Sequence, residues 1–360
     1  MKKSKLAKLI LISLIAILGV FSVCFEDVIN SNINRYLYSR GIYQPKDELS
    51  IHFIDVGEAD AIAINFPNGE VGMIDTGDEN SAQKVMSYID QYIVNTSKHK
   101  KIDYLFFTHC DSDHIGGLKR IVNNYQVKNI YRPRQFCSFE TTDDKNAYIS
   151  TSEIYADTIK TIHQTASNLI TIWDGMEFCV GQTSIQIFAS NKRYVDSNDY
   201  SYFIKLTYNN QSILFTGDAS SVVENDVIEL YGNALKSDYL KVAHHGSKFS
   251  TSLDFLSYVQ PKVAIISVGI NNYGHPAEET LARLSQCGTK IYRTDIDSSV
   301  LINMGQSAKI LKSSYAKDNF YLNCGSLCII IEIFDLIVIQ KEFVLAIKNR
   351  KKLKKLLTKV

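Results

Sequence analysis

Four side chains that can bind metal ions stand within six residues of one another in the run THCDSDHIGG. They are His109, Asp111, Asp113 and His114. Imidazole nitrogens and carboxylate oxygens are the ligands that hold zinc and other divalent cations in proteins. A strand that runs into a glycine-closed turn can bring such groups around one point. The spacing therefore predicts a metal-dependent hydrolase with room for two metal ions.

The elements that must position these residues alternate between strands and helices, as in an α/β protein. Strands are predicted at 51–56, 61–66, 71–74, 102–108, 212–216, 239–243 and 263–268, with more between 169 and 189. Helices are predicted at 85–93, 118–125, 152–164 and 222–231. Asn209 and Asn210 are expected to form a hairpin turn. The pattern indicates sheets covered by helices.

Three of the later strands end, like the strand before His109, in polar residues beside a glycine. The residues that follow them are Asp218, the adjacent pair His244 and His245, and His275. Strand ends that converge on one edge of a sheet are where ligand sites form. We therefore expect these donors to join the first four at one site.

The expected arrangement is a pair of metal ions that share one carboxylate. His109 and Asp111 would hold one ion, Asp113 and His114 the other, and Asp218 would bridge both. A hydroxide between ions about 3.5 to 4 Å apart is a competent nucleophile at neutral pH. Each ion still lacks one imidazole.

Three histidines are available to supply the missing imidazoles. We assign His245 and His275 to the metals, although the sequence leaves open which member of the pair His244 and His245 binds. The other member would contact substrate. The catalytic residues are expected to be Asp113, His244, Ser247 and Lys248.

Each of these residues also has an ordinary structural interpretation. Asp218 and Asp113 can each cap a following helix, and His275 can belong to a turn. Taken singly, such interpretations would suffice, but together the residues favour a metal site. The remaining histidines with no ligand-type neighbours are read as structural, namely His52, His99 and His163.

Composition indicates a globular chain. It has 360 residues, 45% hydrophobic content, five prolines and a net charge of +1. That charge gives no overall attraction to phosphate polymers, so binding of nucleic acid needs a local positive patch. The candidates for such a patch are Lys241, Lys248, Arg132 and Arg134.

The cysteines do not indicate a disulfide framework. There are seven of them, an odd number without regular spacing, and none is assigned to metal. Cys110, next to the first ligand, is expected to point into the core. The chemistry is therefore expected to depend on histidine and aspartate alone.

The N-terminus has the character of a targeting segment. Four lysines between positions 2 and 8 precede an uncharged stretch at 9–25. We predict that 1–30 is a signal sequence or, more in keeping with the absence of a cleavage motif, a membrane anchor. The positive-inside rule then places the hydrolase domain, 31–315, outside the cytoplasm. Residues 316–360 form an extension that is first apolar and then basic.

Six motifs, in order along the chain, resemble those of a known family. They are IDVGEADAIAI at 54–64, MIDTGD at 73–78, THCDSDHIGGL at 108–118, LFTGDAS at 214–220, LKVAHHGSKFSTS at 240–252 and ISVGINNYGHP at 266–276. They resemble the metallo-β-lactamase fold, and within it the hydrolase domain of the competence protein ComEC and its free-standing relatives. The resemblance covers about residues 48–310 and implies a four-layer αββα sandwich with a dinuclear site at one sheet edge.

The chain departs from the broader family at three points. Asp111 stands where histidine is usual, only His163 lies where a further histidine ligand is usual, and Glu58 replaces a neutral amide. A carboxylate in place of an imidazole makes the first site harder and more anionic. Two divalent ions, Zn²⁺ or Mn²⁺, are therefore expected.

A phosphoester is the expected substrate, which makes the chain a phosphodiesterase or nuclease acting on DNA or RNA. The alternatives are an acyl hydrolase of the lactonase or lactamase type, and a phosphorylcholine-esterase-like enzyme for which Trp173 would help to bind the cation. A non-catalytic metal-binding module would require broken ligands, and none is broken. The sequence carries no information on oligomeric state.

Overall fold

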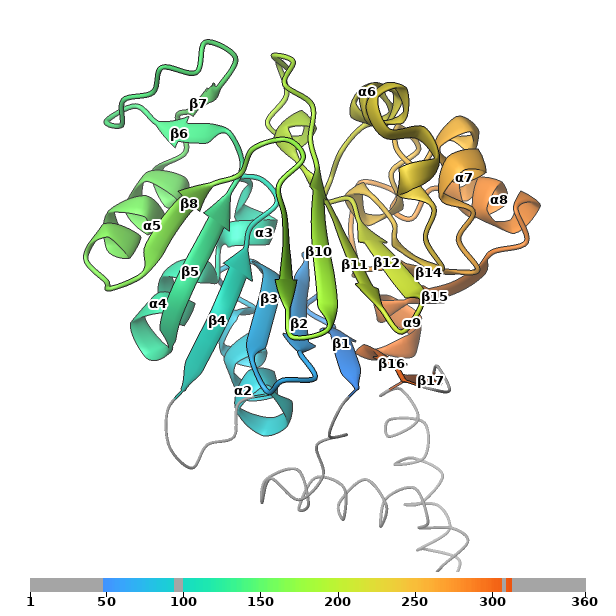
Figure 1. The fold of residues 1–360 in the computed structure, drawn as a ribbon, viewed down its shortest axis with the longest axis horizontal. Helices are drawn as coiled ribbons and strands as arrows, with labels where there is room; N and C mark the ends of the chain where they lie inside the picture. The colour runs from blue at the N-terminus through green and yellow to red at the C-terminus, as the bar shows by residue number, and fades with distance from the viewer. Residues whose placement is uncertain (1–47, 94–99, 306–308, 313–360) are drawn as a thin grey trace, which may run out of the picture. The chain divides into compact units, whose positions relative to one another are not determined.

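Two β-sheets pack face to face across the main apolar core (Figure 1). The computed structural model describes residues 48–93, 100–305 and 309–312, all within one unit that spans 35–314. The predicted anchor at 1–30 and the predicted extension at 316–360 lie outside the described residues. None of the helices described has the length and hydropathy needed to cross a membrane.

The first sheet has eight strands in the order β17-β16-β1-β2-β3-β4-β5-β8. Its strands are β1 (Leu49–Phe53), β2 (Ala61–Asn65), β3 (Val71–Thr76), β4 (Lys101–Phe106), β5 (Gln126–Arg132), β8 (Asn168–Thr171), β16 (Val300–Met304) and β17 (Lys309–Lys312). Strands β3, β4, β5 and β8 are parallel to one another. The carboxyl ends of β3 and β4 therefore meet at the same edge.

The second sheet has seven strands in the order β15-β14-β13-β12-β11-β10-β9. Its strands are β9 (Glu177–Val180), β10 (Thr183–Phe188), β11 (Phe203–Tyr208), β12 (Gln211–Phe215), β13 (Tyr239–Lys241), β14 (Val263–Ile266) and β15 (Lys290–Arg293). Strands β12 to β15 are parallel. A separate pair is formed by β6 (Gln135–Cys137) and β7 (Tyr148–Ser150).

Alternating side chains of the strands build the core between the sheets. Phe53 of the first sheet and Phe215 of the second stack with ring centroids 6.1 Å apart. Ile62, Ile64 and Ile204 are buried in the same cluster. Because successive strand residues point to opposite faces, the other half of each strand is free to pack against helices.

Helices cover the outer face of each sheet, as their separate apolar clusters show. Those on the first sheet are α2 (Ala82–Tyr92), α3 (Ser112–Ile115), α4 (Leu118–Asn124) and α5 (Glu153–His163). Those on the second sheet are α6 (Ser221–Tyr231), α7 (Leu253–Val259) and α8 (Glu278–Gln286). The other helical elements of the described residues are short turns: η1 (Asn198–Tyr200), η2 (Gly232–Leu235), η3 (His244–Gly246) and α9 (Thr294–Asp297). The layers run helices, sheet, sheet, helices.

Most of the predicted elements are confirmed. The predicted helices 152–164 and 222–231 correspond to α5 and α6, which are capped by Ser152 and Ser220. Asn209 and Asn210 form the β11–β12 turn with φ of 50° and 59°. Cys110 is buried in the core under the helices, as predicted. Asp113 does not cap a helix, because α3 already begins at Ser112.

Candidate metal centre

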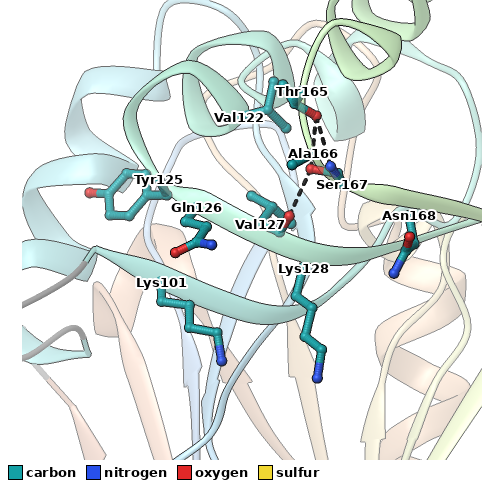
Figure 2. Close-up of a pocket in the computed structure, with 10 residues that line it drawn as sticks. All are labelled: Lys101, Val122, Tyr125, Gln126, Val127, Lys128, Thr165, Ala166, Ser167 and Asn168. Atoms are coloured by element: carbon teal, nitrogen blue, oxygen red, sulfur yellow. Dashed lines mark hydrogen bonds between the residues drawn. The ribbon is translucent and has the colours of Figure 1, made fainter.

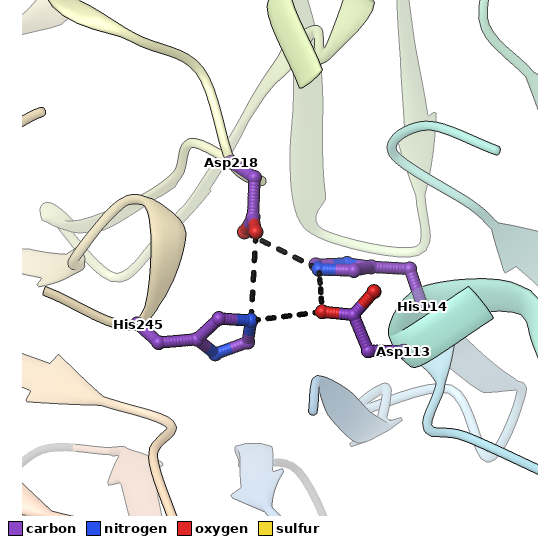
Figure 3. Close-up of side chains that lie close together, drawn as sticks. All are labelled: Asp113, His114, Asp218 and His245. Atoms are coloured by element: carbon purple, nitrogen blue, oxygen red, sulfur yellow. Dashed lines mark hydrogen bonds and ion pairs between the residues drawn. The ribbon is translucent and has the colours of Figure 1, made fainter. Parts of the chain in front are cut away.

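Four of the predicted ligands converge at the carboxyl ends of strands from both sheets. Asp113, His114, Asp218 and His245 each offer a donor atom within 4.8 Å of the others (Figure 3). Nε2 of His245 lies 3.2 Å from Oδ2 of Asp113 and 3.4 Å from Oδ2 of Asp218. Nε2 of His114 lies 3.3 Å from Oδ1 of Asp218. The structure thus brings these segments together at one place.

His109 and Asp111 adjoin this cluster. The rings of His109 and His114 are 4.1 Å apart between centroids. Nε2 of His109 lies 3.9 Å from Oδ2 of Asp111. The two residues predicted to hold the first ion thus stand beside the residues predicted to hold the second.

The donor atoms fit a bound cation. Nε2 of His109, Nε2 of His114 and Oδ1 of Asp218 are buried, and none has a hydrogen-bond partner in the described part of the chain. A buried polar atom left without a partner costs about 1–3 kcal/mol. Nε2 of His114 and Oδ1 of Asp218 lie 3.3 Å apart, and the His109 ring adjoins that of His114. A divalent cation is the partner that the chemistry of these atoms fits.

The other nitrogen of each central imidazole is already engaged. Nδ1 of His114 lies 2.8 Å from Oδ2 of Asp75, and Nδ1 of His245 lies 2.8 Å from the carbonyl oxygen of Ser267. Each Nδ1 donates its hydrogen to that oxygen, so Nε2 is the nitrogen that faces the cluster and that would bind a cation once it has lost its proton. Such outer contacts orient histidine ligands in metalloproteins.

Local backbone conformation sets these side chains in place. Gly217 has a φ of 52° and precedes Asp218 at the end of β12. His244 and His245 both adopt left-handed conformations, with φ of 50° and 51°. Non-glycine residues in this region are uncommon and concentrate at functional sites. The turn separates the two imidazoles, so only His245 enters the cluster.

The histidines of the site differ in protonation in the metal-free protein. Burial lowers the pKa of His109 to about 4, so this ring is neutral at pH 7. Burial also acts against charge on His245, but the carboxylates of Asp218 and Asp113 outweigh it and raise its pKa to about 9. The same carboxylates and Asp75 raise the pKa of His114 well above its usual value.

The remaining predicted residues stand around the cluster. His244 is about one third exposed, and its Nε2 lies 4.0 Å from Oδ2 of Asp218. Ser247 is buried, whereas Lys248 is exposed with its ammonium over the Phe249 ring. His244 and Lys248 are thus the accessible members of the predicted catalytic set.

His275 lies outside the four-residue cluster. Its Nδ1 is 3.0 Å from Oε1 of Glu58, and its ring centroid is 5.4 Å from that of His244. The carboxylate of Glu58 also accepts hydrogen bonds from Gly269 and Asn271. The assignment of His275 as a metal ligand stays a prediction.

Several residues of the site were not assigned a role from sequence. Ser197 donates a hydrogen bond to Oδ1 of Asp111 over 2.7 Å, and the Ser201 hydroxyl lies 3.3 Å from Nδ1 of His109. These hydroxyls lie in the segment where the broader family supplies another histidine. Asp75 was recognisable only as part of the run MIDTGD, and Asp60 as part of IDVGEADAIAI.

The prediction of a positive surface patch is wrong for three of its four residues. Arg132 is buried and pairs with Glu140 at 2.7 Å, and Arg134 pairs with Asp144. Lys241 is buried beneath the cluster. Burial and pairing remove these charges from the surface, so Lys248 is the only one of the four that is exposed.

A cavity of about 420 Å³ lies elsewhere, against the starts of β4, β5 and β8 (Figure 2). Lys101, Tyr125, Lys128 and Asn168 are among the residues that line it. It contains none of the predicted ligands. We therefore locate the candidate active site at the donor cluster and not at this cavity.

The fold and the site define the family. The sequence profile of the metallo-β-lactamase superfamily matches residues 54–270. The chain belongs to this superfamily, and the resemblance found in the sequence is confirmed.

Its relatives include competence proteins. The chain is 32% identical to ComE operon protein 3 of Bacillus subtilis (strain 168) over 267 residues, 70% of this chain and 33% of the relative. It is 26% identical to competence protein ComA of Neisseria gonorrhoeae over 73% of this chain and 33% of the relative. The chain thus spans about a third of these proteins. Among solved structures, the metallo-β-lactamase fold protein YhfI of Bacillus subtilis is similar, with 11% identity and a TM-score of 0.48. The match covers 72% of this chain and 100% of the YhfI chain.

Proposed function

We propose that this chain is a phosphodiesterase that uses a pair of divalent cations, Zn²⁺ or Mn²⁺. The observation that carries the proposal is the set of buried, unpartnered atoms on His109, His114 and Asp218, of which His114 and Asp218 belong to one cluster with Asp113 and His245. His109 and Asp111 would hold one cation, and Asp113, His114 and His245 the other, with Asp218 between them. Cations bound there activate water for attack and offset negative charge on a phosphoryl group.

The chain's own residues position the substrate. His244 stands at the edge of the cluster, partly exposed and outside the ligand set, so its imidazole is free to donate a hydrogen bond to a phosphoryl oxygen. Lys248 places a positive charge four residues further along the same segment. Groups that are fixed before substrate binds are effective at stabilising developing charge.

The ligand set favours phosphoester over acyl hydrolysis. Asp111 brings a carboxylate to the first site, and Ser197 holds one of its oxygens by a hydrogen bond. An oxygen-rich set suits harder cations such as Mn²⁺, and such cations commonly serve phosphoryl transfer. A lactonase or a phosphorylcholine esterase would use the same centre with a different substrate.

Hydrolysis of bis(p-nitrophenyl) phosphate by the purified chain tests the proposal. With added Mn²⁺ or Zn²⁺ we expect release of p-nitrophenolate, and Asp113→Ala should abolish it. His163→Ala is the matched control, because His163 is exposed on α5 and lies outside the cluster. Hydrolysis of a lactone with the diester untouched would replace the proposal with acyl hydrolysis.

Nucleic acid is the phosphodiester that we propose as the natural substrate. One relative is named a competence protein, and another is Recombination protein 2 of Haemophilus influenzae, 26% identical over 83% of this chain. We further propose that the N-terminal segment anchors the domain outside the cytoplasm, on the basis of its lysines and apolar stretch. Single-stranded DNA, RNA and a phosphorylcholine ester, assayed side by side, distinguish the substrate classes.

A further inference from the structure

A lysine is buried directly beneath the metal centre. Lys241 ends β13 and is only 1% exposed. Its neighbours Leu240 and Val242 belong to the apolar core under the second set of helices. Lysine is almost never fully buried unless it is paired. Its presence in this strand therefore calls for a specific partner.

Lys241 has three partners, and all of them belong to the site. Its ammonium forms an ion pair with Oδ2 of Asp60. It donates a hydrogen bond to the carbonyl oxygen of Gly217 over 3.1 Å and lies 3.6 Å from Oδ1 of Asp218. The lysine thus fixes the backbone just before Asp218 by a hydrogen bond and places its positive charge beside the Asp218 carboxylate.

The same ammonium also pairs with one member of a second group of possible metal ligands. Asp60, Asp75 and His114 offer donor atoms within 4.8 Å of one another, as a metal site does. Asp75 already accepts hydrogen bonds from Thr108 and lies 2.8 Å from Nδ1 of His114, while Asp60 pairs with Lys241. The lysine therefore keeps Asp60 from competing for a metal ion next to Asp218.

We propose that Lys241 is a positioning residue of the metal centre, which fixes Asp218 in its metal-binding orientation and keeps Asp60 out of the ligand set. The proposal rests on the metal centre of the proposed function but not on its substrate. The alternative is a purely structural role, in which Lys241 only neutralises the buried carboxylate of Asp60.

A double variant separates these roles. Lys241→Met alone leaves Asp60 buried without its partner, and the protein can fail to fold for that reason. Lys241→Met combined with Asp60→Asn removes both charges at nearly constant volume. If Lys241 only neutralises Asp60, the double variant should bind metal like the unaltered protein.

Titration with Co²⁺ in the absence of substrate, followed by calorimetry and by the visible d–d absorption of the ion, provides the readout. We expect the double variant to bind Co²⁺ about 10- to 100-fold more weakly, as when outer contacts of metal ligands are removed, and with an altered absorption spectrum. Unchanged affinity and an unchanged spectrum would overturn the proposal. Unfolding measured with chelator present reports whether the double variant folds.

Lys205→Met is the matched control. Lys205 is a second lysine whose ammonium is held by backbone carbonyls, those of Ala234 and Lys236, but it lies away from the cluster. Its removal should leave Co²⁺ binding unchanged. Failure of the proposed function would give a different result: the unaltered chain would bind Co²⁺ normally but would cleave no phosphodiester. An unaltered chain that binds no Co²⁺ would overturn the inference and the metal centre together.

Discussion

Asp75 and His114 form a hydrogen bond of 2.8 Å between Oδ2 and Nδ1, 39 residues apart in the sequence. Both side chains are buried. The Asp75 carboxylate also accepts from the backbone nitrogen and the hydroxyl of Thr108. The end of β3 thereby fixes the end of β4 and, with it, the direction of the His114 ring, one of the proposed metal ligands.

Asp75→Asn should weaken cation binding by about 10- to 100-fold, because the amide cannot accept from both Thr108 and His114. Calorimetric titration with Zn²⁺ or Mn²⁺ measures the change. Asp103→Asn is a suitable control, since Asp103 is another buried carboxylate of this sheet that accepts from a backbone nitrogen, here of Val71, far from the ligands. Equal losses of affinity in both variants would contradict the role of Asp75.

Cation binding at pH 7 should release protons. The pKa of His245 is raised to about 9, mainly by Asp218 against the effect of burial, so a cation must displace its proton. Affinity should therefore rise with pH from about 6.5 to about 9. Calorimetry in buffers of different ionisation enthalpy counts the protons. No dependence on buffer or pH would rule out a charged His245 in the metal-free protein.

The same shift predicts how the stability of the metal-free protein depends on pH. A raised folded-state pKa contributes stability that is complete below the unfolded value of 6.5 and is lost as pH rises through about 9. Thermal unfolding in the presence of chelator should thus occur at lower temperature at pH 9 than at pH 6.5. A saturating divalent cation should reduce this difference, because its ligands are already deprotonated.

Adjacent histidines should give different phenotypes. His245→Ala removes a member of the cluster and should lower the bound metal measured by elemental analysis. His244→Ala should leave metal content unchanged and lower kcat/KM by about 10²- to 10³-fold, the usual effect of losing one charge-stabilising donor. The two variants serve as controls for each other, and the reverse outcome would exchange the proposed roles.

The strand ends could be predicted from the sequence because each is an apolar run followed by polar residues and glycine. That pattern located Asp218 and the HHG turn correctly. It did not decide between His244 and His245, because two consecutive left-handed residues determine which ring turns inward, and spacing does not reveal that conformation. Backbone strain of this kind is visible only in three dimensions.

The contacts that support the ligands were harder to predict, since they join distant segments. Ser197 reaches Asp111 across 86 residues. Lys241 was a candidate for a positive surface patch, and lysines are seldom buried. One local feature pointed the other way: Lys241 is flanked by Leu240 and Val242 in a strand of the parallel set, where both faces are covered.

Gly217 links the fold to the site, and its replacement provides a test of that link. An added Cβ would lie 2.8 Å from Oγ of Ser201 and 2.9 Å from Cβ of Thr108, at a φ of 52°. Gly217→Ala should therefore destabilise the fold by more than the about 1–2 kcal/mol expected for left-handed strain alone. Because Asp218 follows directly, cation affinity should fall as well.

Gly175→Ala is the control that measures the strain of the left-handed backbone conformation without any steric overlap. Gly175 also has a positive φ, 76°, but an added Cβ there would meet no atom within 4 Å. The free energy of unfolding of this variant, measured with urea, should fall only by the cost of the left-handed backbone conformation. The variant should bind cations normally. If the two alanine variants unfolded alike and bound metal alike, close packing of Gly217 against Ser201 and Thr108 would not be what positions Asp218.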